Sequence, residues 1–390
     1  MTFDEVFTYD HLYQSYRKCL NGVRWKGTVQ RYEQFSLSNL VQTLEELRKG
    51  TFQTGKFYEF TIMERGKVRH IKSVGIAERV VQRCLCDYCL VPLLTNEFIY
   101  DCGACIKDKG HHWALGRMKY QLRKYFKKHK SNKGYILQYD FHHYFDTIPH
   151  ERLINRVSEV LKDTRLLELY SKLVRDFEGE KGLGLGSQIS QISALFYPNI
   201  IDHYFKGKKG VEAYGRYMDD GYLISSDKEL LRECLVDLKR LVSELDIELN
   251  IDKTQITKLN HFNFLKARFL LLDTGKVIMT PSRKQITRNR RKIKKLAKMG
   301  LPPKEYEQIF NTLLGNLKHY NAFYTRRNLE MLKEELLTIN GRNFVKHSSD
   351  TGKRIIQEET GLVFEEAIDE IPCRFHYIEE GSDEEVGGEA

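Results

Sequence analysis

The sequence has no long hydrophobic run. Across its 390 residues, no apolar stretch approaches the roughly 20 residues that a membrane-spanning helix needs. The first ten residues, MTFDEVFTYD, lack the basic-then-apolar pattern of a secretory signal. Internal repeats and long linkers are absent as well. We therefore expect a cytoplasmic globular protein that has no membrane partner.

Acidic residues are outnumbered by basic ones. The formal net charge is +10 and the sequence pI is about 9.0. Such a charge favours nucleic acid as a partner, although a soluble basic enzyme can carry the same charge. With 41% hydrophobic and 12% aromatic residues, the chain can bury a sizeable core, and its length favours two or three subdomains.

The sequence contains eight cysteines. We expect no disulfides, because the cytoplasm is a reducing compartment, and two other interpretations of the cysteines are open. Two pairs have the spacing of a zinc ribbon, which favours a metal site. The segment 75–94 also reads as one amphipathic helix, in which cysteines are small buried hydrophobes. We favour buried thiols for the clustered cysteines, which are Cys84, Cys86, Cys89, Cys102 and Cys105.

Two adjacent acids interrupt a stretch of strand-forming residues. In AYGRYMDDGYLISS, at 213–226, aromatic and β-branched residues flank Asp219 and Asp220. The pattern predicts a hairpin with both acids near its tight end. Because two neighbouring carboxylates repel each other, they need a counter-charge, and a divalent metal ion would supply it.

A third acid follows another strand. In GYILQYDFHHYFDTIPH, Asp140 ends an apolar run, and Asp146 comes six residues later. Three acids contributed by neighbouring strands could bind two Mg²⁺ ions, as two-metal phosphoryl transfer requires. The alternative is a set of strand-end carboxylates that pair with Lys and Arg.

The remaining pattern alternates helices with strands, which is typical of an α/β palm. The basic run at 281–300 contains nine basic residues and no acidic ones, and it is either a solvated helix face or a surface that binds phosphates. The acidic end of the chain, 378–390, is expected to be disordered.

The sequence predicts several helices along the chain. We expect a helix that ends at Gly50, a helix from about His150, a helix over 188–206, a helix capped by Ser226 and Glu229, and helical structure over 305–324.

Six motifs in order resemble the reverse transcriptases. The tetrad at 217–220 is similar to the catalytic motif of that family, and DFHHYFD and GLGLGSQISQ precede it as in the family's palm. GKVRHIKSVGIAERVVQ and DCGACIKDKGHHWAL are similar to finger motifs of bacterial and group II intron enzymes. LNIDKTQI and FNFLKARF resemble the later palm motifs. The resemblance covers about residues 60 to 275.

The resemblance implies a polymerase shaped like a right hand, of the α/β (α+β) class. Its palm would be an antiparallel sheet with helices, and its thumb would be helical. The expected regions are N-terminal helices and fingers at 1–134, a palm at 135–275, a basic helical thumb at 276–345 and a C-terminal extension at 346–390.

The resemblance also assigns the residues that would carry the chemistry. Asp140, Asp219 and Asp220 resemble the metal-binding triad of the family, in which Asp220 contributes more to the electrostatics than to ligation. Phe141 is counted with these metal-site positions. Lys253 matches the lysine that protonates the departing pyrophosphate. The implied cofactor is Mg²⁺, as two ions, with Mn²⁺ as an alternative.

Further positions would bind the substrates. Lys67 and Arg69 match residues of the fingers that hold the incoming triphosphate, a role suited to a forked guanidinium. Phe145 matches the steric gate that excludes a ribose 2′-OH. Tyr217 is counted with these substrate-binding positions, and 264–269 would be the primer grip.

The sequence departs from the family pattern after the glycine-rich loop. Where most members have Gln-Gly followed by Ser-Pro, this chain has Leu185 before Gly186 and ends the motif with Gln191. This departure resembles diversity-generating retroelements, whose enzymes misincorporate opposite adenine. Loss of a polar side chain beside the nascent pair is a physical reason to expect lower fidelity. Related phage-defence lineages also vary here.

The expected activity is therefore RNA-directed DNA polymerisation, error-prone in a diversity-generating retroelement. The alternatives are an antiphage-defence reverse transcriptase, a non-catalytic maturase-like RNA-binding protein, and an RNA-templated RNA polymerase or untemplated nucleotidyl transferase with the same palm. The expected partners are template RNA, an RNA/DNA primer duplex, dNTPs, a dedicated structured RNA and a small accessory protein. No endonuclease, protease or ribonuclease H motif is visible.

Overall fold

The computed structural model describes residues 1–64 and 66–347 of the chain. Helices alternate with strands, and every strand pairing within the three sheets is antiparallel. The predicted α/β fold class is thus confirmed. No helix in this described part is long and apolar enough to cross a membrane. The acidic end at 378–390, expected to be disordered, lies outside the described residues.

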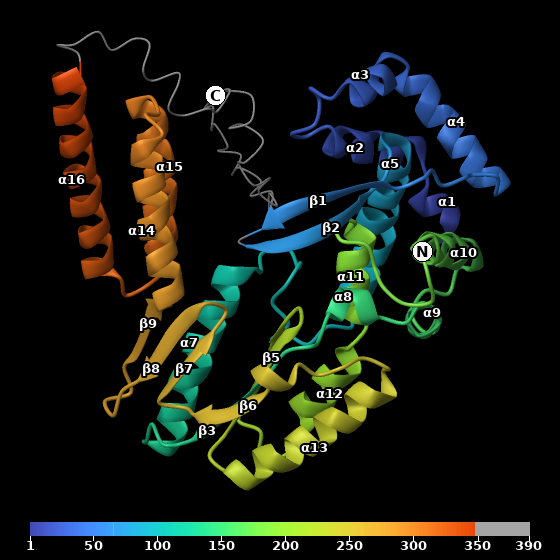
Figure 1. Cartoon of the computed structure of the whole chain (residues 1–390). Coiled ribbons are helices and arrows are strands. Elements are labelled where there is room, and N and C mark those ends of the chain that lie inside the picture. The colour runs from blue at the N-terminus through green and yellow to red at the C-terminus, as the bar shows by residue number, and fades with distance from the viewer. Residues whose placement is uncertain (65, 348–390) are drawn as a thin grey trace, which may run out of the picture.

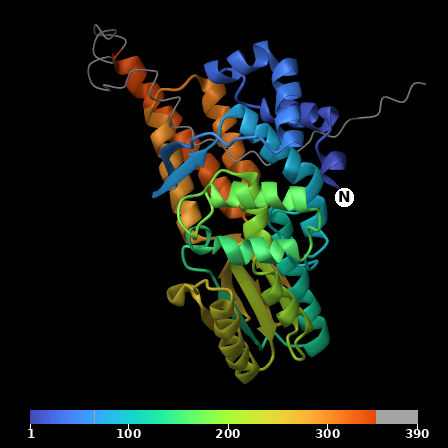
Figure 2. The ribbon, with the colours of Figure 1, turned by 90° about the vertical axis from the view of Figure 1, so that its right-hand side faces the viewer.

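Helices of the N-terminal region lie at one end of the molecule, and the central sheet lies at the other (Figures 1 and 2). The helix predicted to end at Gly50 does so, with a left-handed glycine at φ 69°. Glycine adopts this conformation without a steric penalty. The helices of this region are α1 (Phe3–Val6), α2 (Tyr9–Cys19), α3 (Gly27–Gln34) and α4 (Ser36–Lys49).

A two-stranded ribbon and a long helical segment follow. Strands β1 (Tyr58–Glu64) and β2 (Lys67–Ser73) pair with each other, and the ribbon extends toward the C-terminal helices (Figure 1). The helix predicted over 75–94 is present but changes pitch, because a π-helical turn at Cys86–Leu90 separates α5 (Ile76–Leu85) from α6 (Val91–Thr95).

The clustered cysteines are core residues, as we favoured. Cys84, Cys86, Cys89 and Cys102 are fully buried. Burial raises the pKa of the Cys84 thiol to about 12, which opposes the thiolate form that zinc requires. Within residues 1–64 and 66–347, the cysteines belong to no group of side chains that could hold a metal ion.

The central sheet carries the predicted acids. Its strand order is β4-β5-β3-β6, so β3 lies between β5 and β6. Its strands are β3 (Tyr135–Tyr139), β4 (Ala213–Tyr217), β5 (Asp220–Ser225) and β6 (Gln255–Lys258). The helices of this region are α7 (His111–His129), α8 (Tyr144–Thr147), α9 (His150–Ser158), α10 (Thr164–Arg175), α11 (Gln188–Phe196), α12 (Asn199–Gly207) and α13 (Lys228–Glu244).

Two sequence expectations about these helices were wrong. The single helix expected over 188–206 is two helices, α11 and α12, separated at Pro198, which has no N–H to continue the first helix. Ser226 does not cap α13. Asp227 does, since its side chain accepts a hydrogen bond from the backbone N–H of Glu229 at 2.8 Å.

The C-terminal part combines a small sheet with long helices. The sheet has the order β7-β8-β9, and α14 and α16 pack side by side (Figure 1). All nine basic side chains of α14 are exposed, while Ile293 and Leu296 are buried. The segment 305–324 is interrupted between α15 and α16. The bounds are β7 (His261–Phe264), β8 (Ala267–Leu271), β9 (Val277–Pro281), α14 (Arg283–Lys298), α15 (Pro303–Leu317) and α16 (Phe323–His347).

Candidate active site

The two adjacent acids lie at the tip of the β4–β5 hairpin, as predicted. Tyr217 pairs with Asp220, so Met218 and Asp219 form a two-residue turn. Met218 has φ 58°, in the left-handed region that a side chain with a Cβ rarely adopts. The tight turn places Asp219 at the tip and Asp220 at the first position of β5.

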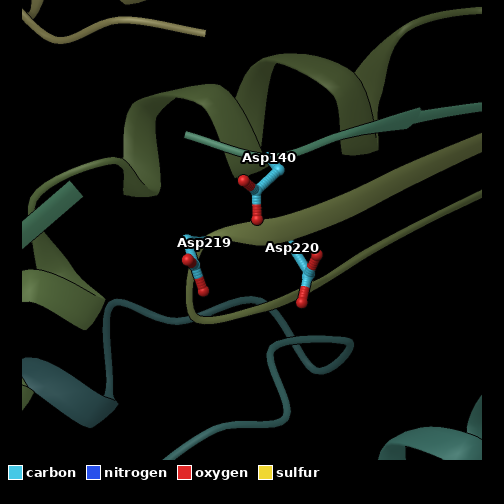
Figure 3. Close-up of side chains that lie close together, drawn as sticks. All are labelled: Asp140, Asp219 and Asp220. Atoms are coloured by element: carbon cyan, nitrogen blue, oxygen red, sulfur yellow. The ribbon is translucent and has the colours of Figure 1, made fainter. Parts of the chain in front are cut away.

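Asp140 joins them because β3 and β5 are neighbours. Tyr139 pairs with Gly221, so the residue after β3 comes beside the residue that opens β5. One carboxylate oxygen from each of Asp140, Asp219 and Asp220 lies within 4.8 Å of the others. Figure 3 shows the three side chains gathered at this point. In the described part of the chain, this is the one group of side chains that could hold a metal ion.

Polar groups from the segment before β6 hold Asp140. The Nζ of Lys253 donates to Oδ2 of Asp140 at 2.6 Å, and the side-chain amide of Asn250 donates to the same oxygen at 3.3 Å. The backbone N–H of Asn250 also donates to the carbonyl of Asp140 at 2.8 Å. Asn250 lies within the motif LNIDKTQI, but nothing in the local sequence indicates its role. Its pairing depends on β3 and β6 being neighbours, although 110 residues separate the two partners.

The site carries more negative charge than its surroundings neutralise. Burial, and then the charges of Asp219 and Asp140, raises the pKa of Asp220 to about 7. Burial and the charge of Asp140 also raise the pKa of Asp219. Burial alone would lower the pKa of Lys253, but its hydrogen bond to Asp140 and the three nearby carboxylates raise it. A bound cation would relieve this repulsion.

These donors fit a hard divalent cation. Carboxylate oxygens are the ligands that Mg²⁺ and Mn²⁺ prefer, and three of them converge here. Phe141 cannot contribute through its side chain, because a phenyl ring has no oxygen or nitrogen to bind a metal ion; the ring is buried and lies 5.0 Å from that of Tyr144. Its backbone carbonyl is the one oxygen that it could offer.

Phe145 lies on α8, close to the glycine-rich loop. The backbone N–H of Leu183 donates to the carbonyl of Phe145 at 2.7 Å, and the Phe145 ring is half-buried. The backbone at Phe145 is therefore held in place, while part of the ring stays accessible. Its role as a gate against ribonucleotides remains a prediction.

The unusual motif at 185–191 packs against the β1–β2 ribbon. Leu185 forms an isolated β-bridge with Ile71 of β2. Gly186 has φ 105°, and a Cβ there would lie 3.3 Å from the Ile71 side chain, so the close approach and the backbone both favour glycine. Gln191 lies in α11, where its side-chain oxygen accepts a long hydrogen bond from Cys105 at 3.9 Å. The motif therefore connects the ribbon to the helix.

The remaining predicted positions lie in β2 and β4. Arg69 is half-buried in β2. Burial and the charge of Asp140 raise the pKa of Asp219, and the positive charge of Arg69 partly offsets this increase. Lys67 is the first residue of β2. Tyr217 ends β4, and its ring meets that of His111 edge-on at 6.3 Å.

The segment predicted as the primer grip forms the β7–β8 hairpin. Its two turn residues, Leu265 and Lys266, both have positive φ, at 46° and 64°. Two consecutive non-glycine residues in this region are strained, a condition that clusters at ligand-binding sites. A ring nitrogen of His111 lies 3.0 Å from the carbonyl of Leu265, so this histidine contacts both the turn and Tyr217. The sequence analysis gave His111 no role in the site.

Acids so placed at the tip of an antiparallel hairpin are suited to a metal-dependent nucleotidyltransferase. A comparison with known protein families identifies the kind of nucleotidyltransferase. Residues 64–269, more than half of the chain, match the model described as "Reverse transcriptase (RNA-dependent DNA polymerase)". The chain therefore belongs to the reverse transcriptase family, which generally uses divalent metal ions. The prediction of a nucleotidyltransferase of this kind is confirmed at the level of the family.

The chain is also similar to a curated bacterial protein. It is 24% identical over 247 residues to "Protein YkfC" of Escherichia coli (strain K12). The similar region covers 53% of this chain and 64% of that protein, which is less than two thirds of its length.

Proposed function

We propose that this protein is an active RNA-directed DNA polymerase that uses two Mg²⁺ ions. The observation that carries the proposal is the convergence of Asp140, Asp219 and Asp220 within 4.8 Å. Bound Mg²⁺ would activate the primer hydroxyl and stabilise the leaving phosphates. A non-catalytic maturase-like protein would have no need to keep three repelling carboxylates together.

The chain's own residues would bind and orient the reactants. Asp140, Asp219 and Asp220 hold the cations, and the carbonyl of Phe141 is a further oxygen at this position. Arg69 and Lys67 bind the triphosphate from the fingers ribbon. Lys253 would protonate the pyrophosphate oxygen as it leaves; its hydrogen bond to Asp140 and its raised pKa, which keeps it protonated at neutral pH, support this role.

Other residues would select the nucleotide and the duplex. Phe145 excludes the ribose 2′-OH, and Tyr217 contributes to substrate binding. The exposed basic face of α14 binds the phosphates of a template–primer duplex, without sequence preference. Template RNA, an RNA/DNA primer duplex and dNTPs are the substrates.

For the biological role, we propose error-prone synthesis of cDNA in a diversity-generating retroelement. The support is the apolar Leu185, which packs against the fingers ribbon where a polar residue is common in the family. A dedicated structured RNA and a small accessory protein would be its partners in the cytoplasm. The competing interpretation is a role in antiphage defence, which predicts no concentration of cDNA errors opposite adenine.

Primer extension tests the activity. On a primed RNA template with Mg²⁺ and dNTPs, the wild-type protein should make cDNA, and chelation of the metal should stop it. Asp219→Asn should abolish extension, since the metal site loses a ligand. Asp146→Asn is the matched control, because Asp146 is exposed and lies outside the triad. Activity of Asp219→Asn within about tenfold of the wild type would refute the two-metal assignment.

A further inference from the structure

A buried arginine belongs to the hairpin that carries Asp219 and Asp220. Among the residues that the structure describes, Arg216, in β4, is the largest of the fully buried side chains, and its side chain is 0% exposed. Asp202, on α12, is also 0% exposed. Two contacts join them, Nη2 to Oδ2 at 2.5 Å and Nε to Oδ1 at 2.7 Å. Each charge is therefore neutralised by a bidentate partner.

The guanidinium also bonds to the catalytic turn. Its Nη1 donates to the carbonyl of Met218 at 2.8 Å, and its Nη2 donates to the carbonyl of Leu195, at the end of α11, at 2.9 Å. Met218 is the turn residue with positive φ. One buried cation thus ties the strained turn to α11 and, through Asp202, to α12.

The same ion pair reaches the other side of the acid site. The Tyr214 hydroxyl donates to Oδ1 of Asp202 at 2.6 Å. The Tyr214 hydroxyl has one proton, and its bond to Asp202 uses it. The Tyr139 hydroxyl, whose oxygen lies 2.7 Å from that of Tyr214, must therefore donate to the Tyr214 oxygen. Tyr139 directly precedes Asp140. A continuous chain of buried hydrogen bonds therefore runs from the carbonyl before Asp219 to the residue before Asp140.

We propose that Arg216 and Asp202 are positioning residues for the metal site. They hold the Met218–Asp219 turn against the mutual repulsion of the carboxylates, so that the three acids stay at the spacing that a divalent cation needs. This inference rests on the proposed function.

The polar nature of the pair supports a positioning role over mere packing. A buried ion pair contributes little net stability compared with well-packed apolar residues of similar volume. Apolar residues could fill this space, but they could not donate to the Met218 carbonyl. A donor with a fixed planar geometry can do so while it keeps its carboxylate partner.

The test replaces the whole pair. Removing the charge of one partner would leave an unpaired buried charge and strongly destabilise the protein, whereas the double variant Arg216→Met with Asp202→Leu removes both charges together. Mn²⁺ binding to the protein without nucleic acid is measured by electron paramagnetic resonance. Folding is checked by thermal denaturation, and hydrogen exchange is followed at residues 217–221.

We expect the double variant to stay folded but to bind Mn²⁺ about 10- to 100-fold more weakly, as when groups that orient metal ligands are removed. Amides of the turn should exchange faster. The matched control is Lys208→Met with Asp237→Leu, because this ion pair joins the end of α12 to α13 and has no contact with the turn. The control should bind Mn²⁺ as the wild type does.

Wild-type Mn²⁺ affinity in the folded double variant would overturn the inference. If that variant does not fold, Arg216→Lys decides the matter, because lysine keeps the charge but cannot bond to both Asp202 and the Met218 carbonyl. Weakened Mn²⁺ binding in folded Arg216→Lys supports positioning, and unchanged binding refutes it. If the wild-type protein itself neither binds Mn²⁺ nor extends a primer, the proposed function fails as well.

Discussion

The Nζ of Lys253 lies 2.6 Å from Oδ2 of Asp140, within the group of three carboxylates. The lysine thus supplies positive charge where a metal ion would also supply it. This contact raises the pKa of Lys253, so the side chain is a proton donor rather than an acceptor at neutral pH.

Replacing Lys253 should slow chemistry without weakening nucleotide binding. If Lys253 protonates the leaving pyrophosphate, Lys253→Ala should lower kcat by about 100-fold or more and leave KM for dNTP nearly unchanged. Single-turnover incorporation measures this. Lys258→Ala, an exposed lysine of β6, is the control. Full recovery by Lys253→Arg would contradict proton donation, since a guanidinium does not release its proton.

The stability of the metal-free protein should fall as pH rises. The pKa of Asp220 is about 7 in the folded state and near 3.8 when unfolded, so between these values the folded state binds more protons. Unfolding then becomes easier with increasing pH through this window. Thermal denaturation in EDTA between pH 5 and pH 8 should show the decline. Mg²⁺ should restore more stability at pH 8 than at pH 5.

Asp220→Asn provides the control for this pH dependence. The variant carries no titrating group at this position, so its melting temperature in EDTA should exceed that of the wild type at pH 8. The difference should narrow toward pH 5, where folded Asp220 is protonated, and should vanish only below the unfolded-state pKa of 3.8. A wild-type protein whose stability in EDTA rises steadily over this range, in parallel with the variant, would be evidence against the raised pKa.

Opening the gate should admit ribonucleotides. Phe145→Ala removes the ring beside the expected 2′ position, so discrimination against rNTPs should fall by about 1 to 3 kcal/mol. The ratio of kcat/KM for dNTP and rNTP measures it. Phe145→Tyr keeps the bulk of the ring and should retain the discrimination. Unchanged rNTP exclusion in Phe145→Ala would mean that another residue is the gate.

Fidelity should depend on the side chain at position 185. Sequencing cDNA made on a mixed RNA template should reveal errors concentrated opposite adenine. Leu185→Gln should reduce them, because a positioned amide adds contacts that only a well-shaped pair satisfies. Leu185→Met keeps the site apolar and should keep the errors. Equal error frequencies opposite all four bases, with no response to Leu185→Gln, would remove the case for a diversity-generating role.

Local chemistry alone determined several features of this protein. The end of α4 at Gly50 needs a residue that accepts positive φ, and the hairpin at Asp219 and Asp220 needs strand formers on both sides of a short turn. Asp140 was recognisable because an apolar strand directly precedes it. These signals lie within a few residues of each other, so the sequence was sufficient to predict them.

Tertiary structure decided the contacts that complete the site. Asn250 contacts Asp140 only because β3 and β6 are neighbours, and Arg216 is paired only because α12 places Asp202 beneath β4. Leu185 meets β2 through a bridge between distant segments. A buried charge is tolerated only where a partner lies within hydrogen-bond distance, and chain folding, not local sequence, sets that distance.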